Sequence, residues 1–437
     1  MWPYYPELLS VPVPRYTSYP TAVEFSDVVG EAEQEAALAG AAGDVSLYVH
    51  IPFCEQICWY CGCNTAAANK RGRLEAYLDA LHHEIALTGA KLGRQARVKR
   101  IAFGGGSPNA LQPTDFVRLA DALTLHMPLD KPEWSVEIDP RHLTSAWGTV
   151  MAVVGVTRAS LGVQTFSPRL QQAIGRVQPG EQIERAVHLL RRAGVRSLNF
   201  DLMYGLPGQT RDDLKDSLDR TIEFGADRVA LFGYAHVPHI IARQRRIDAT
   251  ALPDQAERFA MAEFGYRHFT HAGYVPVGFD HFAMPGDPLA QAARSGTLRR
   301  NFQGFTDDQA TQLIGLGSTA ITCFPQVIVQ NEKNAGRYGQ MIGQNRLTGS
   351  LGVVRSEDDQ RRGAVIEALL CQGRARVGQD WLSSMAESLH PFIERGLASI
   401  EGDWLAIRDQ GLPYARTIAA RFDGYRAASQ HKFSSAV

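Results

Sequence analysis

Short apolar segments alternate with amphipathic helical patterns over the first half of this 437-residue chain. Six segments have the length and residue types of buried strands: 45–51, 98–103, 134–138, 158–164, 196–204 and 227–234. Helical periodicity fills intervals between them at 74–92, 113–127, 181–195 and 211–226. Thr114 is the expected N-cap of the second helix and Gly194 the expected stop of the third. Because parallel neighbours need crossover connections, this alternation predicts an α/β fold with a parallel sheet.

The pattern also suggests a division of the chain into three parts. Residues 1–40 form an expected N-terminal arm, residues 41–330 the sheet domain, and residues 331–437 a small, mainly helical C-terminal domain. In the last part we expect helices at 357–377 and 380–400, followed by a turn and a short strand in "EGDWLAI". Periodicity leaves open whether the sheet is doubly wound or a partial barrel. In both cases, loops at the carboxyl ends of the strands build the site.

Composition and charge limit the partners and the cellular location that we expect for the protein. The formal net charge is −1 and no basic run is present, so we expect neither a nucleic-acid nor a membrane partner. The first residues lack the basic and apolar regions of a signal peptide. No apolar run reaches the ~18 residues that would span a bilayer. We therefore expect a cytoplasmic protein, and nothing in the sequence demands more than a monomer.

Four of the six cysteines fall within ten residues, and three of them, Cys54, Cys58 and Cys61, have the spacing C-x3-C-x2-C. A reducing cytosol disfavours structural disulfides, so such a group is more often metal-binding or catalytic. Soft thiolates suit an iron–sulfur cluster. Three ligands would leave one iron of a four-iron cube open to a substrate or cofactor, by the logic that separates open from closed zinc sites.

Two alternatives fit the cysteines less well. Structural zinc usually needs two separated ligand pairs, and the remaining Cys323 and Cys371 are lone residues in apolar contexts. A C-x-x-C redox pair formed by Cys58 and Cys61 leaves the flanking thiols unexplained. The iron–sulfur interpretation is favoured.

Other polar residues lie near the ends of expected strands, which favours a single active site. They are the segment "FGGGSP" (103–108), Glu137, Gln164, Asp201 and the segment "YAHVP" (234–238). Glycines in the first segment allow close approach of a ligand to the backbone, although such segments are more often simple turns. Glu137 and Asp201 could accept bonds from an ammonium or hydroxyl group, or could instead cap the next helix. An arginine such as Arg176 is more often a solvated loop residue than a carboxylate partner.

A series of motifs makes the chain similar to a known family. "PRYTSYPTA" (14–22) and "YVHIPFCEQICWYCGCN" (48–64) are followed in order by "VEIDPR", "LGVQTF", "FDLMYGLPGQT", "YAHVP", "DHFA" and "RNFQGF". Over nearly the whole chain this series resembles the oxygen-independent coproporphyrinogen III oxidases (dehydrogenases) of heme biosynthesis, in the radical S-adenosylmethionine superfamily. The resemblance implies a partial (β/α)6 TIM-like barrel.

The resemblance also implies the chemistry. Cys54, Cys58 and Cys61 would hold one [4Fe-4S] cluster whose fourth iron is open to S-adenosylmethionine. A 5′-deoxyadenosyl radical would take a hydrogen from a propionate, and loss of CO2 and an electron would leave a vinyl group. Two propionates of coproporphyrinogen III would react, giving protoporphyrinogen IX without oxygen. The reductant would be a protein such as flavodoxin or ferredoxin.

The site residues follow from the same resemblance, with two S-adenosylmethionine molecules. The first would contact Tyr48, Gly105, Glu137 and Ile321. The second would contact Tyr60, Gly106, Ser107, Gln164, Arg176, Asp201 and Ala235. Tyr60 and Ser107 stand where the family usually carries Phe and commonly Thr, and they keep the aromatic face and the hydroxyl. Cys63 would not be a cluster ligand but a residue of the catalytic site.

Some residues and rival functions stay open. Arg15, Arg299 and Arg300 are candidates to bind substrate propionates, although each is individually more typical of a surface arginine. His50 fits a packed strand-end residue as well as a functional one, and the segment 280–283 is a candidate lining of the porphyrin pocket without a catalytic role for His281. One rival is a heme-binding or heme-trafficking relative, which typically lacks "PRYTSYPTA" and the equivalent of Cys63. Another is a radical enzyme that acts on a different substrate, such as a methyltransferase, a heme-degrading homologue or an enzyme of another tetrapyrrole, and the product would identify it. The least specific alternative is a non-enzymatic zinc or iron–sulfur interaction protein.

Overall fold

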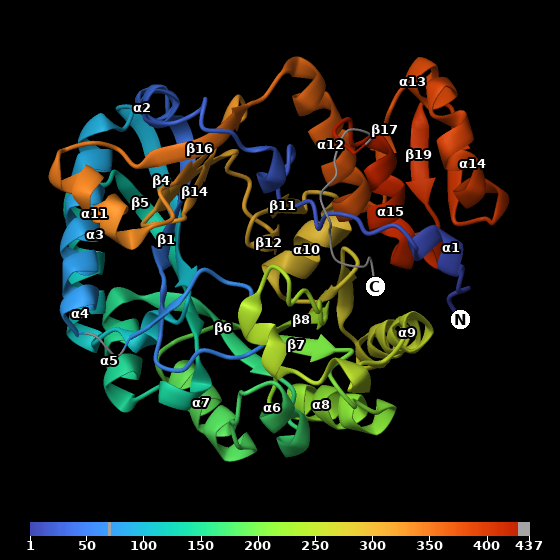
Figure 1. Ribbon diagram of the computed structural model, residues 1–437, viewed down its shortest axis with the longest axis horizontal. Coiled ribbons are helices and arrows are strands. Elements are labelled where there is room, and N and C mark those ends of the chain that lie inside the picture. The colour runs from blue at the N-terminus through green and yellow to red at the C-terminus, as the bar shows by residue number, and fades with distance from the viewer. Residues whose placement is uncertain (69–70, 427–437) are drawn as a thin grey trace.

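A twelve-stranded sheet organises the computed structural model, which describes residues 1–68 and 71–426 (Figure 1). Its strand order is β16-β15-β14-β13-β1-β4-β5-β6-β7-β8-β10-β9. The central six strands are all parallel: β1 (Ala42–Ile51), β4 (Gln95–Gly105), β5 (Leu129–Ile138), β6 (Val156–Gln164), β7 (Ser197–Tyr204) and β8 (Arg228–Gly233). These strands confirm the predicted parallel sheet. The sheet ends in two edge strands and therefore does not close into a full barrel.

Additional strands extend the sheet on both sides. β13 (Gln312–Leu316) pairs with β1 in parallel, and three antiparallel strands follow it: β14 (Ile321–Cys323), β15 (Val327–Asn331) and β16 (Gly349–Val354). Beyond β8 lie the antiparallel strands β10 (His281–Ala283) and β9 (Val275–Val277). β16 lies beyond residue 330 and still belongs to this sheet. The division of the chain at residues 40 and 330 stays a prediction.

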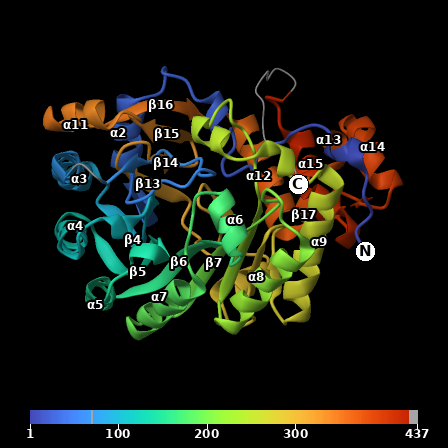
Figure 2. The ribbon, with the colours of Figure 1, turned by 60° about the horizontal axis from the view of Figure 1, so that its bottom comes forward.

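Helices follow successive parallel strands and cover the outside of the curved sheet (Figure 2). They are α3 (Arg71–Lys91), α4 (Pro113–His126), α5 (Ser145–Val154), α7 (Gly180–Arg192), α8 (Arg211–Glu223) and α9 (Gln255–His271), with the short α6 (Pro168–Ala173) before α7. On α3, Leu81 and Ile85 are fully buried, as the apolar periodicity predicts. Among the described residues, no helix is both long enough and apolar enough to cross a membrane.

The helix ends test two expectations from the sequence. Gly194 has φ +96° just after α7 ends at Arg192, which confirms it as the stop. Thr114 as an N-cap is wrong, because α4 begins one residue earlier at Pro113 and Gln112 occupies the cap position. Proline with its fixed φ is favoured at the first helical position, so it sets the start.

The C-terminal segment is less helical than its sequence pattern suggests. α12 (Glu357–Gln372) ends at Gly373, and the range 380–400 contains α13 (Gln379–Ser384) and α14 (Ala386–Glu394) rather than one helix. The strands β17 (Arg374–Arg376), β18 (Ala398–Glu401) and β19 (Trp404–Ile407) form a separate antiparallel sheet. Gly373 and Gly396 have φ +67° and +68°, which end the helices before these strands. The predicted turn and strand in "EGDWLAI" are confirmed. Residues 427–437 of this segment lie outside the described residues.

The N-terminal arm connects the C-terminal segment to the sheet. The arm contains the α-helices α1 (Pro6–Leu9) and α2 (Glu31–Ala39). Elsewhere in the chain, the α-helices and strands not yet given are β2 (Phe53–Cys54), β3 (Ala66–Ala67), α10 (Pro288–Ser295), β11 (Arg299–Asn301), β12 (Gly304–Thr306), α11 (Ala335–Gly343) and α15 (Ala415–Ala419). The Tyr5 amide donates to Tyr414 Oη at 2.8 Å, and Tyr16 Oη donates to Asp423 at 2.9 Å. Figure 1 shows the arm beside the red C-terminal segment.

An ion network closes the amino end of the sheet. Asp307 accepts from Arg100 of β4 at 2.7 Å and from Arg158 of β6 at 2.8 Å, and Arg228 of β8 lies 3.5 Å away. Burial raises the pKa of Asp307, but hydrogen bonds from Arg158 and Arg100 outweigh it and hold the pKa far below its usual value. The network lies at the end of the strands opposite to the end of β1 that leads into the cysteine-containing segment.

Candidate active site

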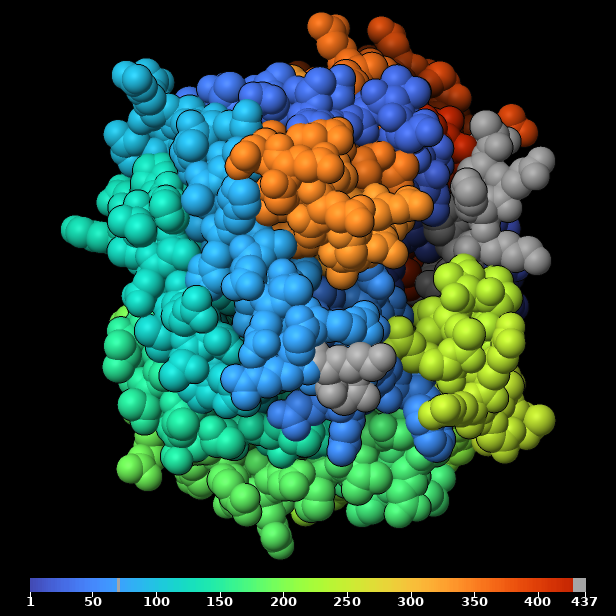
Figure 3. All heavy atoms as spheres, turned by 60° about the vertical axis from the view of Figure 1, so that its left-hand side comes forward, coloured from blue at the N-terminus to red at the C-terminus, as the bar shows by residue number. Residues whose placement is uncertain are grey.

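The cysteines lie in the loop that leaves the carboxyl end of β1. The two-residue strands β2 and β3 pair in parallel and close the loop at its base. Outside contacts fix its course: the Trp59 amide donates to Ile174 O at 3.1 Å, and Gln244 Nε2 donates to Tyr60 O at 2.9 Å. In the space-filling view, blue surface of the first part of the chain lies beside the green and yellow-green segments that follow the later strands (Figure 3). The loop is therefore held by its own short strand pair and by two later segments, one after α6 and one after β8.

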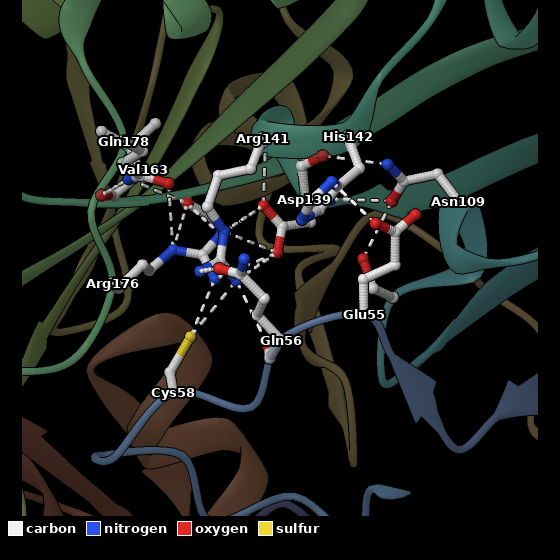
Figure 4. Close-up of polar contacts among 12 residues, drawn as sticks. Glu55, Gln56, Cys58, Asn109, Asp139, Arg141, His142, Val163, Arg176 and Gln178 are labelled. Carbon is white, nitrogen blue, oxygen red and sulfur yellow. Dashed lines mark hydrogen bonds and ion pairs between the residues drawn. The ribbon is translucent and has the colours of Figure 1, made fainter. Parts of the chain in front are cut away.

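Two arginines point at the sulfur of Cys58 (Figure 4). Arg176 Nη1 donates to Cys58 Sγ at 3.2 Å, and Arg141 Nη2 donates to it at 3.5 Å. The Cys63 amide lies 3.4 Å from Cys61 Sγ, and hydrogen bonding from Cys63 lowers the pKa of Cys61 to about 6. Such donors stabilise thiolates, the form in which cysteine binds iron. The donor set therefore fits an iron–sulfur cluster, although no trio of His, Cys, Asp or Glu among the described residues is spaced for a single metal ion.

Asp139 orients both arginines. It lies 2.6 Å from Arg141 Nη2 and 3.3 Å from Arg176 Nη2. Burial raises its pKa, but Arg176 and Arg141 outweigh that effect and lower the pKa to about 2. Arg141 also donates to Gln56 of the cysteine loop at 3.1 Å. Neither Asp139 nor Arg141 was assigned a role from sequence, although both stand in the "VEIDPR" motif.

The glycine segment after β4 needs its glycines because other groups occupy the space of their side chains. A Cβ on Gly104 would lie 2.4 Å from the Glu137 carboxylate, and one on Gly105 would lie 2.3 Å from the His50 ring. A Cβ on Gly106 would lie 2.4 Å from Phe53 O. Gly106 and Ser107 donate their amides to the backbone of the cysteine-loop base at 2.8 and 2.7 Å. The segment is thus a packed connection between β1, β4 and β5 rather than a simple exposed turn.

Glu137 and Asp201 both face the inside of the sheet and line one cavity of about 360 Å³. Burial raises the pKa of both, that of Glu137 to about 7. The Gly105 amide donates to Glu137 at 3.1 Å, and Ser160 donates to Asp201 at 2.9 Å. Neither carboxylate caps a helix. Asp201 lies within β7, three residues before its last, so its expected place at the strand end is wrong.

A second cavity, of about 550 Å³, brings together three of the expected residues. Tyr48, Cys63 and Gly105 line it with His50. Tyr48 Oη lies 3.3 Å from His50 Nδ1, while His50 Nε2 is buried without a partner among the described residues. The cavity therefore joins the cysteine loop to the glycine segment.

The remaining expected residues have varied surroundings. Arg176 is buried and donates to Gly162 O at 2.7 Å, so it is not a solvated loop residue. Gln164 ends β6 with φ +68°, Ser107 is buried and donates to Asn109, and Tyr60 packs on an apolar cluster with Ile174. Ile321 does not line the cavity of about 550 Å³ that contains Tyr48; it lines another cavity, of about 290 Å³. Ala235 lines a fourth cavity beyond β8.

The expected propionate-binding arginines differ in their charge balance. Arg299 is paired with Glu367 at 2.7 Å, so its charge is already compensated. Arg15 and Arg300 have no ion pair among the described residues. Arg300 instead lies over the Phe305 ring at 4.3 Å. His281 is hydrogen-bonded to Asp280 at 2.6 Å and lines the Asp201 cavity.

The parallel sheet with a three-cysteine loop after its first strand defines a radical S-adenosylmethionine protein, and the superfamily model "Radical SAM" matches residues 48–221. The chain is 41% identical to the oxygen-independent coproporphyrinogen III oxidase of Bradyrhizobium diazoefficiens over 437 residues, 97% of each chain. It is 40% identical to the anaerobic coproporphyrinogen III oxidase 1 of Cereibacter sphaeroides, covering 96% of this chain and 95% of the relative. The solved coproporphyrinogen III oxidase of Escherichia coli superposes with TM-score 0.90 at 34% identity, covering 97% of this chain and 99% of that one.

These alignments cover almost the whole of this chain and almost the whole of each relative. The chain belongs to the family of oxygen-independent coproporphyrinogen III oxidases. The mainly parallel fold and the family expected from the motifs are thereby confirmed.

Proposed function

We propose that the protein converts two propionate side chains of coproporphyrinogen III into vinyl groups without oxygen, giving protoporphyrinogen IX for heme synthesis. Family membership supports this activity. The observation that carries it is the cysteine loop at the carboxyl end of β1, where Cys58 Sγ accepts from two buried guanidinium groups. A purely structural loop would have no need of two cations aimed at one thiol.

Cys54, Cys58 and Cys61 hold one [4Fe-4S] cluster in this proposal. When bound, the cluster and S-adenosylmethionine supply the radical chemistry, and the protein supplies position and exclusion of water. Arg176 and Arg141 offset the negative charge of the thiolates. Asp139, which bonds both arginines, keeps them aimed at Cys58.

The two S-adenosylmethionine molecules are assigned to the cavity that Tyr48 lines and to the cavity that Asp201 lines, which the hydrogen bond from Gly105 to Glu137 connects. The first molecule binds at Tyr48 and Gly105, which line the cavity of about 550 Å³, and at Glu137 of the neighbouring cavity, whose buried carboxylate is hydrogen-bonded to Gly105 and can accept from an ammonium group. Ile321 belongs to this set only by resemblance, since it lines a different cavity. The second molecule binds toward Asp201, with Tyr60, Gly106, Ser107, Gln164, Arg176 and Ala235. Cys63, which lines the first cavity, faces the reacting groups.

The external partners are also part of the proposal. An electron donor such as flavodoxin or ferredoxin reduces the cluster, and the protein works as a monomer. Cys54 and Cys61 are half-buried rather than fully enclosed, which leaves the loop within reach of a docked donor. Size-exclusion chromatography with light scattering measures the monomer directly.

The activity is tested by anaerobic incubation of the reconstituted protein with coproporphyrinogen III, S-adenosylmethionine and dithionite. We expect both protoporphyrinogen IX and 5′-deoxyadenosine, and loss of both when Cys54, Cys58 or Cys61 becomes alanine. Cys371→Ala is the matched control, because this buried cysteine of α12 packs in an apolar cluster away from the loop.

Other results would identify the rivals. Formation of 5′-deoxyadenosine without vinyl product would overturn the substrate but keep the radical enzyme. Tight heme binding with neither product would favour the heme-trafficking relative.

A further inference from the structure

The segment that follows β8 lies directly against the cysteine loop. Its short 3-10 helix η4 (Ala242–Arg246) carries three arginines, and the Arg243 guanidinium donates to Cys63 O at 3.1 Å. The Arg246 guanidinium lies over the Trp59 ring, 6.0 Å from its centroid. Figure 3 shows the yellow-green surface of this segment beside the blue surface of the first part of the chain. The cysteine loop and η4 therefore form one continuous surface.

Two arginines of this surface carry charge that no described acidic residue compensates. Arg245 and Arg246 are both exposed, and neither makes an ion pair or a hydrogen bond with any residue in 1–68 or 71–426. Glu55, the one acidic residue of the cysteine loop, lies 2.8 Å from His142. Asp248, the next acidic residue after η4, caps a helical turn of its own. Water solvates exposed guanidinium groups well, so their charge alone indicates no partner. Their position beside the cysteine loop is the informative feature.

An exposed apolar side chain stands on the same segment. Ile240 has an exposed fraction of 65%, and its neighbour Ile241 packs against the loop, where a Cβ on Gly62 would lie 3.0 Å from Ile241 Cδ1. A single exposed apolar residue is normal on a protein surface. Here, however, it lies near Trp59 and exposed arginines, and aromatic residues and arginine are the residues enriched where proteins dock. The composition is that of a docking surface for an acidic partner with an apolar centre.

The place of this surface indicates which partner it receives. Electron transfer becomes much slower with distance, so a protein that reduces a cluster held by Cys54, Cys58 and Cys61 must dock against the cysteine loop. Cys61 is half-buried and Cys63 is exposed, so the loop can be approached from solvent. Opposite charges speed the encounter of two proteins and set their orientation. A flavodoxin, an acidic protein that exposes the apolar edge of its flavin, fits both the charge and the apolar centre.

We infer that η4 and the cysteine loop form the docking surface for a flavodoxin that supplies electrons to the cluster. This inference rests on the proposed function and identifies its electron donor. Arg245 and Arg246 face carboxylates of the flavodoxin, and Ile240 faces the flavin edge. Arg243 instead holds η4 to the loop backbone. In the transfer the reduced flavin loses one electron and the cluster gains it, and no bond forms or breaks.

The test reverses the two exposed charges in the double variant Arg245→Glu/Arg246→Glu. Isothermal titration calorimetry at low ionic strength measures binding of oxidised bacterial flavodoxin. Formation of 5′-deoxyadenosine is measured with reduced flavodoxin and, separately, with dithionite, a small reductant that needs no docking surface. We expect the double variant to weaken flavodoxin binding and to raise the KM for flavodoxin by about tenfold or more. The rate with dithionite should stay unchanged. Added salt should weaken binding to the wild type more than binding to the variant.

Matched variants separate docking from folding. Arg245→Glu alone removes no contact with a described residue and should show part of the effect with wild-type iron content and thermal stability. Arg294→Glu is the control, because Arg294 is also exposed and makes no ion pair with a described residue. It lies on α10, which begins where Asp287 pairs with Arg228 at the amino end of β8, away from the cysteine loop. This variant should bind flavodoxin as the wild type does.

Three results would overturn the inference. The first is unchanged flavodoxin affinity in a double variant with wild-type iron content. The second is a raised KM for coproporphyrinogen III at unchanged flavodoxin affinity, because the arginines would then serve the substrate. The third is a dependence on these arginines with a ferredoxin but not with flavodoxin. Failure of the proposed function appears separately, as absence of vinyl product from the wild type with dithionite.

Discussion

Substitution of Glu84 by glutamine should remove a large pH dependence of stability. Glu84 lies on α3 with an exposed fraction of 1%. Its carboxylate accepts from the Gly317 amide at 2.5 Å and from Tyr338 Oη at 2.8 Å. It therefore holds the turn after β13, whose Ser318 amide bonds to Tyr77 Oη, which in turn donates to His50 O at the end of β1. The carboxylate supports the backbone beneath the cysteine loop.

The magnitude follows from the pKa. Burial raises the pKa of Glu84 from 4.5 to about 7, and each tenfold change in proton affinity is worth about 1.4 kcal/mol. Because the folded state binds the proton more tightly than the unfolded state, this stabilisation is complete below about pH 4.5. It is lost as the pH rises to about 7, by about 3 kcal/mol in total. Glutamine mimics the protonated acid and carries no such dependence.

Urea unfolding followed by circular dichroism under anaerobic conditions measures the effect between about pH 4.5 and about pH 8. The free energy of unfolding of Glu84→Gln, relative to the wild type, should rise by about 3 kcal/mol over this interval. Glu137, whose pKa is also about 7, contributes equally to both proteins and cancels. Glu75→Gln, on the exposed side of α3, should run parallel to the wild type. Parallel curves for Glu84→Gln and the wild type would refute the reasoning.

Three further substitutions test the site and the sheet. Gly106→Ala should cost about 1–3 kcal/mol of unfolding free energy and lower the iron bound per chain after reconstitution, because its Cβ meets the backbone of β2; unchanged iron content would count against this. Asp307→Asn should lower the free energy of unfolding in urea by about 3–5 kcal/mol, because buried arginines lose the carboxylate that they share. Asp130→Asn is the control and should leave stability unchanged, because Asp130 forms an exposed ion pair with Lys99. Arg141→Met should make the cluster reduction potential more negative in a spectroscopic redox titration, since it removes a cation 3.5 Å from Cys58 Sγ; a positive change would contradict the assigned role.

Local sequence was sufficient for the central strands and for the cysteine loop. A buried strand is predicted from a run of consecutive apolar residues, as in 45–51. The spacing of Cys54, Cys58 and Cys61 is likewise visible within a few consecutive residues. The C-terminal helix expected at 380–400 failed for a physical reason. Its apolar pattern suits both a helix and a strand of a small sheet, and Gly396 selects the strand through a left-handed backbone.

Interactions between distant segments could not be predicted from sequence. Asp139 and Arg141 stand in a quoted motif, yet nothing local shows that they converge on Cys58 with Arg176. Arg245 and Arg246 were missed for the same reason, because the fold alone brings their segment to the cysteine loop. Among the expected arginines, Arg299 carries no excess charge only because Glu367 of α12 lies beside it.

The central claim is that the cysteine loop generates a radical that takes hydrogen from a propionate. The most direct measurement uses coproporphyrinogen III labelled with deuterium on the propionate carbon next to the ring, incubated anaerobically with the reconstituted protein. Mass spectrometry of the 5′-deoxyadenosine should find one deuterium for each vinyl group formed. Vinyl product accompanied by unlabelled 5′-deoxyadenosine would contradict the account.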